Sequence, residues 1–138
     1  IGDYAFSNCN KMNFIEIFIL LFLHWVSDFV FQTDNIARNK SKSNKILATH
    51  VSFYILLFIP FAFYFLTPMN ATIFIAINLV LHFIIDYCTS RRTSYLSSIN
   101  KYGSTTVPNF GMFSIIGLDQ FLHYVSLFGT YIVLKGIS

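Results

Sequence analysis

Charged residues are scarce in this chain of 138 residues, because Asp, Glu, Lys and Arg together make up only 11% of it. A soluble domain carries about 25%. The shortage argues against an ordinary soluble domain. The net charge of +3 is not organised as a basic stripe, so we expect no nucleic-acid partner.

Cysteine is also rare, and the common catalytic glycine motifs are missing. The two cysteines, Cys9 and Cys88, lie far apart and outside any CxxC spacing. That spacing excludes a disulfide framework and gives no sign of a zinc–thiolate site. The sequence contains no GxSxG motif, no P-loop and no Rossmann glycine pattern. Any chemistry must therefore come from other side chains.

Hydrophobic residues make up 55% of the chain and gather in four long runs. The runs cover residues 14–31, 46–66, 71–88 and roughly 110–134. At 1.5 Å per residue, about 20 residues of helix cross a hydrocarbon core of about 30 Å. The sequence predicts an all-α, polytopic membrane protein with four transmembrane helices in a lipid bilayer. Residues 12–138 would form one domain, and residues 1–11 an N-terminal extension that this pattern does not define.

Basic residues concentrate in two loops between the predicted helices. The first loop contains Arg38, Lys40, Lys42 and Lys45, and the second contains Arg91, Arg92 and Lys101. By the positive-inside rule, both basic loops are expected to be cytoplasmic. Polar residues follow in 93–109, where we expect an ordered loop or a short interfacial helix that could cover a site.

All four histidines lie in apolar runs, where a polar group is costly. Three of them have an aspartate four positions away, in the pairs His24/Asp28, His82/Asp86 and Asp119/His123, and His50 lies near the start of the second run. Residues at i and i+4 share one face of a helix. With both basic loops on one side, all seven residues fall at a similar depth in the cytoplasmic half of the membrane.

Imidazole and carboxylate groups together suit Zn²⁺, Mn²⁺ or Fe. We expect one or two such divalent ions, held by His24, Asp28, His50, His82, Asp86, Asp119 and His123. Seven ligands exceed those of one structural zinc and suit two metals that share a bridging carboxylate. Gln32, Asn78 and Gln120 are expected to support the ligands by hydrogen bonds. The alternatives are an ion or proton relay without a tightly bound metal, and purely structural hydrogen bonds between helices.

Five basic residues are candidates for binding an anionic or phosphorylated substrate: Lys40, Lys42, Lys45, Arg91 and Arg92. The simpler interpretation is that they only set the membrane topology.

The first and third runs end in similar segments, residues 24–29 and 82–87, and each is followed by a basic loop and an apolar run that contains a histidine. This similarity predicts a duplicated helical hairpin, with the site between its two halves.

Several of these segments together resemble the domain-of-unknown-function 3307 family. They are residues 24–34, 39–45, His50, 82–87 and 119–123. The family consists of small integral membrane proteins of bacteria and their phages, so the resemblance implies a bacterial inner-membrane protein. It covers nearly the whole chain from Met12 and supplies no substrate. The His/Asp pattern is more loosely similar to that of membrane-bound metal-dependent hydrolases.

The leading hypothesis is a metal-dependent hydrolase of a phosphoester in a lipid or another amphiphile. Asp119 would be the general base, and Asp86 would also be required for catalysis. One alternative is a metal-ion or proton transporter or channel that acts as a homo-oligomer. Another is a non-enzymatic envelope partner protein of a phage or bacterium.

Overall fold

The structure is a computed structural model that describes residues 12–103 and 110–137. Its elements are α2 (Phe14–Trp25), the π-helical turn η1 (Val26–Val30), α3 (Asp34–Asn39), α4 (Asn44–Phe65), α5 (Pro68–Ser98) and α6 (Met112–Gly136). These two ranges contain no strand, which confirms the predicted all-α class. The predicted extension 1–11 lies outside the described residues.

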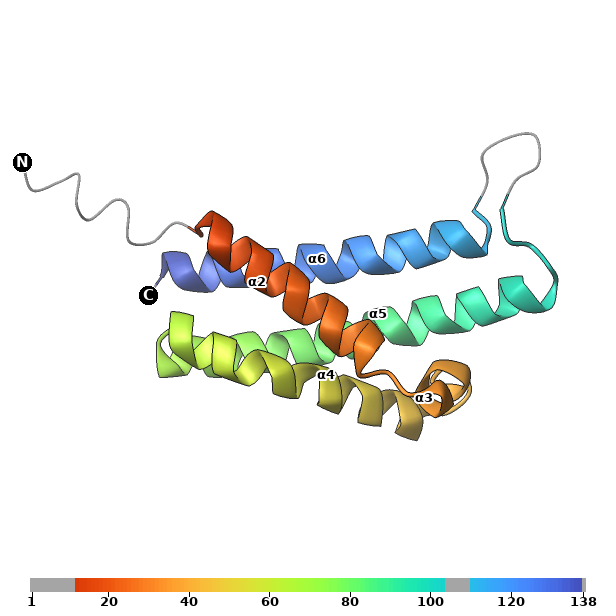
Figure 1. Ribbon diagram of the computed structural model, residues 1–138, viewed down its shortest axis with the longest axis horizontal. Coiled ribbons are helices and arrows are strands. Elements are labelled where there is room, and N and C mark those ends of the chain that lie inside the picture. Colours follow the sequence, from red (N-terminus) through yellow and green to blue (C-terminus); the bar gives the residue numbers. More distant parts are fainter. Residues whose placement is uncertain (1–11, 104–109, 138) are drawn as a thin grey trace, which may run out of the picture.

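The three long helices α4, α5 and α6 lie side by side, each antiparallel to the one before it (Figure 1). Helix α2 crosses them obliquely, so that its beginning lies near the end of α6 and η1 lies near α4. The short helix α3 lies at the opposite end of the bundle, beside the beginning of α4. This arrangement brings side chains from η1, α4, α5 and α6 toward one region of the interior.

Polar caps define where the first helices begin. Asn13 and Glu16 form a capping box on α2, in which each side chain accepts a hydrogen bond from the backbone N–H of the other. Thr33, Ser43 and Thr67 accept hydrogen bonds at the beginnings of α3, α4 and α5. A side-chain oxygen satisfies a backbone donor that has no partner within the helix.

Helix α5 differs most from its predicted range. It begins at Pro68, where proline is well tolerated, and continues ten residues beyond Cys88 to Ser98. Residues 93–98 are therefore part of a long helix and do not form the expected loop or separate interfacial helix. Hydropathy marks only the apolar portion of a helix, so it gave no sign that the polar turns after Cys88 remain helical.

Within residues 12–103 and 110–137, two helices, α4 and α5, are long and apolar enough to cross a membrane. Two of the four predicted membrane helices therefore meet this criterion. Helix α2 has only 12 residues before the π-helical turn, and α6 carries Asp119, Gln120 and His123 within its apolar sequence. Both features interrupt the long, continuous apolar helix that a clear membrane span requires.

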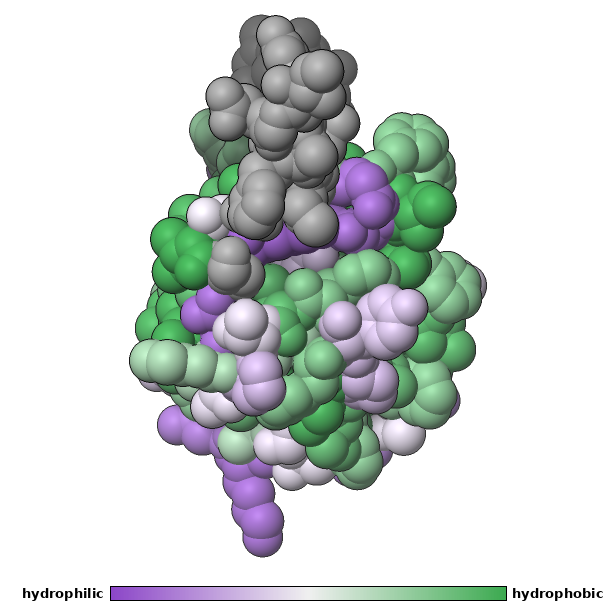
Figure 2. Space-filling model, turned by 90° about the vertical axis from the view of Figure 1, so that its left-hand side faces the viewer, coloured by the Kyte–Doolittle hydropathy of each residue, from purple (hydrophilic) through white to green (hydrophobic). Residues whose placement is uncertain are grey.

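The hydrophobic core lies toward the end of the bundle where α2 begins. It includes Leu20, Tyr54, Phe58, Phe74, Leu127 and Tyr131. Many other large hydrophobic side chains point outward, among them Phe14 and Phe22 on α2 and Phe121 on α6. Viewed from the end where α2 begins and α6 ends, much of the visible surface is hydrophobic, shown in green in Figure 2.

One ion pair joins the beginning of α2 to the end of α6. Lys135 Nζ lies 2.5 Å from Glu16 Oε1, and the side chains are 12% and 3% exposed. Glu16 also completes the capping box with Asn13. The carboxylate thus accepts from Lys135 and from both the backbone N–H and the side-chain amide of Asn13, which offsets the cost of burying it.

We expect Lys135→Met to lower the free energy of unfolding by about 3–5 kcal/mol, because it leaves the Glu16 carboxylate buried without its cation. Adding Glu16→Gln should restore much of the loss. The measurement is denaturant unfolding in detergent micelles, with Lys45→Met as the control because Lys45 is exposed. Equal stability of Lys135→Met and wild type would contradict this role.

Candidate metal centre

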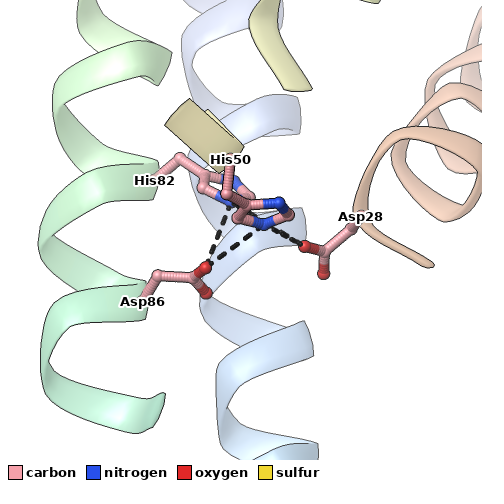
Figure 3. A group of neighbouring side chains, drawn as sticks. All are labelled: Asp28, His50, His82 and Asp86. Carbon is pink, nitrogen blue, oxygen red and sulfur yellow. Dashed lines mark hydrogen bonds and ion pairs between the residues drawn. The ribbon is translucent and has the colours of Figure 1, made fainter. Parts of the chain in front are cut away.

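Four buried side chains from three elements converge on one point in the bundle. Asp28 comes from η1, His50 from α4, and His82 and Asp86 from α5 (Figure 3). Each offers one ligand atom, and these atoms all lie within 4.8 Å of one another. All four residues are at most 3% exposed. The described residues therefore contain a buried His/Asp cluster that could hold a metal ion.

The distances in this cluster suit a small coordination sphere. His50 Nε2 lies 3.0 Å from Asp28 Oδ1, 3.4 Å from Asp86 Oδ2 and 3.5 Å from His82 Nε2. His82 Nε2 lies 3.8 Å from Asp28 Oδ1 and 3.6 Å from Asp86 Oδ2. Around a tetrahedral ion with bonds of about 2.1 Å, neighbouring ligand atoms would be about 3.4 Å apart. The donor atoms and their spacing thus fit zinc or a similar divalent ion.

A second group shares Asp86 with the first. It consists of Asp86, Asp119 and His123, again with ligand atoms within 4.8 Å. His123 Nε2 lies 3.9 Å from Asp86 Oδ1, whereas Asp86 Oδ2 faces the first group. The two oxygens of one carboxylate thus face two neighbouring sets of ligands, as a bridge between two metals requires.

One hydrogen bond of His123 determines which of its ring nitrogens is available to bind a metal ion. Nδ1 lies 2.8 Å from the backbone carbonyl of Asp119, which can only accept, so Nδ1 carries a proton. In the neutral imidazole, Nε2 then has a free lone pair. This atom is buried and has no hydrogen-bond partner within the described part of the chain. A metal ligand with this kind of backbone contact is common in proteins.

His24 was predicted as a ligand, but the structure places it outside both groups. Its Nδ1 lies 3.0 Å from the Tyr54 hydroxyl, and its Nε2 lies 2.9 Å from Gln120 Oε1. The i, i+4 spacing does bring Nε2 within 3.9 Å of Asp28, but the Gln120 oxygen is closer. Both ring nitrogens are therefore occupied by hydrogen bonds.

Gln120 connects His24 to the carboxylates. Its amide nitrogen donates to Asp28 Oδ2 at 3.2 Å and to Asp119 Oδ2 at 3.0 Å, while its oxygen faces His24. Thr89 donates a further short hydrogen bond to Asp119. Sequence reasoning anticipated a supporting contact from Gln120 and missed Thr89, whose only signal was its position three residues after Asp86.

The other two amides predicted to support the ligands lie differently. Asn78 donates to Phe74 O and to Thr130 Oγ1, so it joins α5 to α6 away from the cluster. Gln32 lines the cavity beside Asp28, and its Oε1 is buried without a partner in the described residues.

Lys40 reaches the cluster from the turn between α3 and α4. Its Nζ lies 3.0 Å from Asp86 Oδ2. Burial favours the neutral amine, but the carboxylates of Asp86 and Asp28 outweigh it, so the pKa of Lys40 is above its usual value. Lys40 is therefore a permanent counter-charge for the buried aspartates.

A cavity of about 540 Å³ extends from the three carboxylates of Asp28, Asp86 and Asp119 toward α3 and the last turns of α5. Lys40 and Arg38 are the basic residues that line it. Arg38 was predicted only as a topology signal, although it lies just two residues before Lys40.

The remaining predicted anion-binding residues do not line this cavity. Lys42 and Lys45 are exposed. Arg91 stacks over the Tyr87 ring at 3.7 Å and donates to Asn44, and Arg92 lies 5.5 Å from the Tyr95 ring. In the described structure these four residues lie on the outer surface of the bundle.

A protein-family model described as "Protein of unknown function (DUF3307)" matches residues 17–137, a range that includes every residue of both ligand groups. No curated protein and no solved structure matches the chain. Because the match spans most of the sequence and the whole candidate metal centre, the chain belongs to the DUF3307 family.

Proposed function

We propose that this protein is a membrane-embedded, metal-dependent hydrolase that cleaves a phosphoester of a lipid or another amphiphile. The observation that carries the proposal is the pair of buried ligand groups joined by Asp86, which lie beside a cavity lined by Lys40. Adjacent metal sites that share a carboxylate are typical of enzymes that hydrolyse phosphoesters.

The outer surface supports a membrane setting. In the most apolar stretches of α4 and α5, only 44% and 28% of residues are buried inside the molecule, whereas the core helix of a soluble protein would be mostly buried. Exposed aromatic side chains also cover α2 and α6. A soluble monomer rarely exposes so much apolar surface. We propose that α2 with η1 and α6 lie in the bilayer beside α4 and α5, which gives four membrane helices.

The basic residues near α3 then suggest an orientation. With Arg38, Lys40, Lys42 and Lys45 at one end, the positive-inside rule places this end at the cytoplasmic side of a bacterial inner membrane. The cavity would open toward that side, where a phosphoester headgroup lies. A substrate that approaches from one surface suits a hydrolase better than a transporter.

The chemistry follows from the positions of the side chains. Bound divalent ions would lower the pKa of water to about 7 and offset charge on the phosphoryl oxygens. Asp119 is 15% exposed and lies on the cavity wall, so it can accept a proton from the attacking water. Thr89 and Gln120 hold this carboxylate in place. The water oxygen bonds to phosphorus, the ester P–O bond breaks, and the proton passes to the leaving alcohol.

Two basic residues are placed to hold the anionic substrate. Arg38 in α3 and Lys40 just after it line the cavity, as do residues of the last turns of α5. Lys40 lies next to Asp86 and so next to both ligand groups. Its ammonium would contact a phosphoryl oxygen once a metal ion has taken over part of the neutralisation of Asp86.

Metal content is the first test. We expect the detergent-purified protein to hold about one to two equivalents of Zn, Mn or Fe, measured by elemental mass spectrometry. His82→Ala/Asp86→Ala should lose the metal because it removes two ligands of the first group and the shared carboxylate. His24→Gln removes a histidine outside both groups and should retain it. A metal-free wild type, purified without chelator, would overturn the proposal.

Substitution of the two catalytic aspartates should separate their roles. Asp119→Asn should lower kcat for a phosphoester amphiphile by about 10²–10⁴-fold through loss of the general base. It should keep the metal of the first group. Asp86→Asn should lose both metal and activity. The measurement is release of the alcohol product, with Asp34→Asn as a control at an exposed carboxylate. Full activity of Asp86→Asn would refute the mechanism.

A further inference from the structure

The last turns of α5 present a continuous face of hydroxyl groups to the cavity. Six hydroxyl residues of α5 line it: Thr89, Ser90, Thr93, Ser94, Ser97 and Ser98. They recur at intervals of four residues in two adjacent rows, so they lie on one side of the helix. At 1.5 Å per residue the face is about 13 Å long. It begins next to Asp119, to which Thr89 donates a hydrogen bond, and leads away from the ligand groups.

Several polar groups along this cavity have no protein partner. Ser90 Oγ and Gln32 Oε1 are buried without a hydrogen bond within the described residues. Thr93 and Ser97 are partly exposed and Ser94 is exposed, and their hydroxyls make no side-chain hydrogen bond in the described part of the chain. Thr89 and Ser98 bond to their own helix. Buried polar groups in proteins almost always have a partner. Ser90 Oγ and Gln32 Oε1 therefore call for a partner, and the accessible hydroxyls beside them can also bond to a ligand that carries hydroxyl groups of its own.

The charge of the cavity favours an anion. Three carboxylates and two basic side chains line it, for a net charge of −1, and two bound divalent ions would change this to +3. A phosphoryl group is attracted by that charge. A headgroup that ends in an ammonium would instead be repelled by Arg38 and Lys40 on the wall facing α5.

The size and the apolar edge of the cavity indicate how large the ligand is and that part of it is hydrophobic. A volume of about 540 Å³ falls within the usual range of small-molecule sites and is far larger than a phosphate ion needs. Phe29, Met112 and Ile116 line one part of it. Phe29 and Ile116 are also 48% and 38% exposed, so an alkyl chain could lie along them.

We infer that this cavity binds the headgroup of an anionic amphiphile in which the group beyond the phosphate carries hydroxyls, as in glycerol or a sugar. The inference rests on the proposed function for the phosphoester itself. It adds that the hydroxyl face of α5, and Thr93 and Ser97 in particular, selects the headgroup while the ligand groups hold the phosphate.

Non-hydrolysable phosphonates test this inference without any need for catalysis. Binding of an alkyl phosphonate with a glycerol headgroup is compared with that of its ethanolamine counterpart, by calorimetry on the zinc-loaded protein in detergent. Wild type should bind the glycerol compound at least tenfold more tightly, from about two additional hydrogen bonds. Thr93→Val/Ser97→Ala should remove this preference and keep the affinity for an alkyl phosphonate without a headgroup. The control is Ser52→Ala, because Ser52 is exposed on α4 and bonds only to its own helix.

Equal affinity of wild type for the two headgroups, or an unchanged preference in Thr93→Val/Ser97→Ala, would overturn the inference. The glycerol phosphonate without its alkyl chain should bind more weakly, and equal affinity for it would exclude an amphiphile. Hydrolysis of the matching phosphoester is measured in parallel. Selective binding without hydrolysis would refute the proposed function and leave the headgroup site intact, whereas hydrolysis without selectivity would refute only the headgroup site.

Discussion

The polar interior of this protein is organised around the buried carboxylate of Asp86. Lys40, His50, His82 and His123 all lie within 4 Å of its oxygens. They come from the α3–α4 turn, α4, α5 and α6, so the three long helices and the turn before α4 each supply one partner. Burying an unpaired carboxylate costs several kcal/mol. The packing of the helices and the neutralisation of this charge therefore depend on each other.

The same requirement links the structure to the proposed chemistry. Asp28, Asp86 and Asp119 form an anionic region inside an apolar bundle, and Lys40 supplies only one of the positive charges that they need. Divalent ions would supply the remainder and would share Asp86 with Lys40. The cations that neutralise the buried carboxylates, Lys40 and the divalent ions, could therefore also bind a phosphoryl anion.

The residues of the two candidate ligand groups could be picked out from the sequence because i, i+4 spacing in apolar segments is a local property. Asp28, His82, Asp86 and His123 could be found from their own helices, and His50 from its depth beside the first basic loop. The exclusion of His24 could not be predicted, since it depends on Gln120 and Tyr54 from two other helices. The duplicated hairpin and the membrane orientation remain predictions.

The cavity was harder to predict from the sequence than the two ligand groups were. Its hydroxyl face exists because α5 continues to Ser98, and a loss of hydropathy after Cys88 looks the same whether the chain stays helical or not. Arg91 was a plausible anion-binding residue until packing placed it against Tyr87 and Asn44. Which loop cations enter a cavity is decided by helix ends, and hydropathy defines these poorly.

Asp28 is held by the π-helical turn η1, whereas the other residues of the two ligand groups lie in α-helices. It places Asp28 at 3.0 Å from His50 by fitting one more residue into the turn than an α-helix holds. Loss of one residue there would restore ordinary α-helical bonding but rotate one side of the turn by about 100° relative to the other. A deletion that leaves a regular helix at this point would therefore still turn the Asp28 carboxylate away from His50.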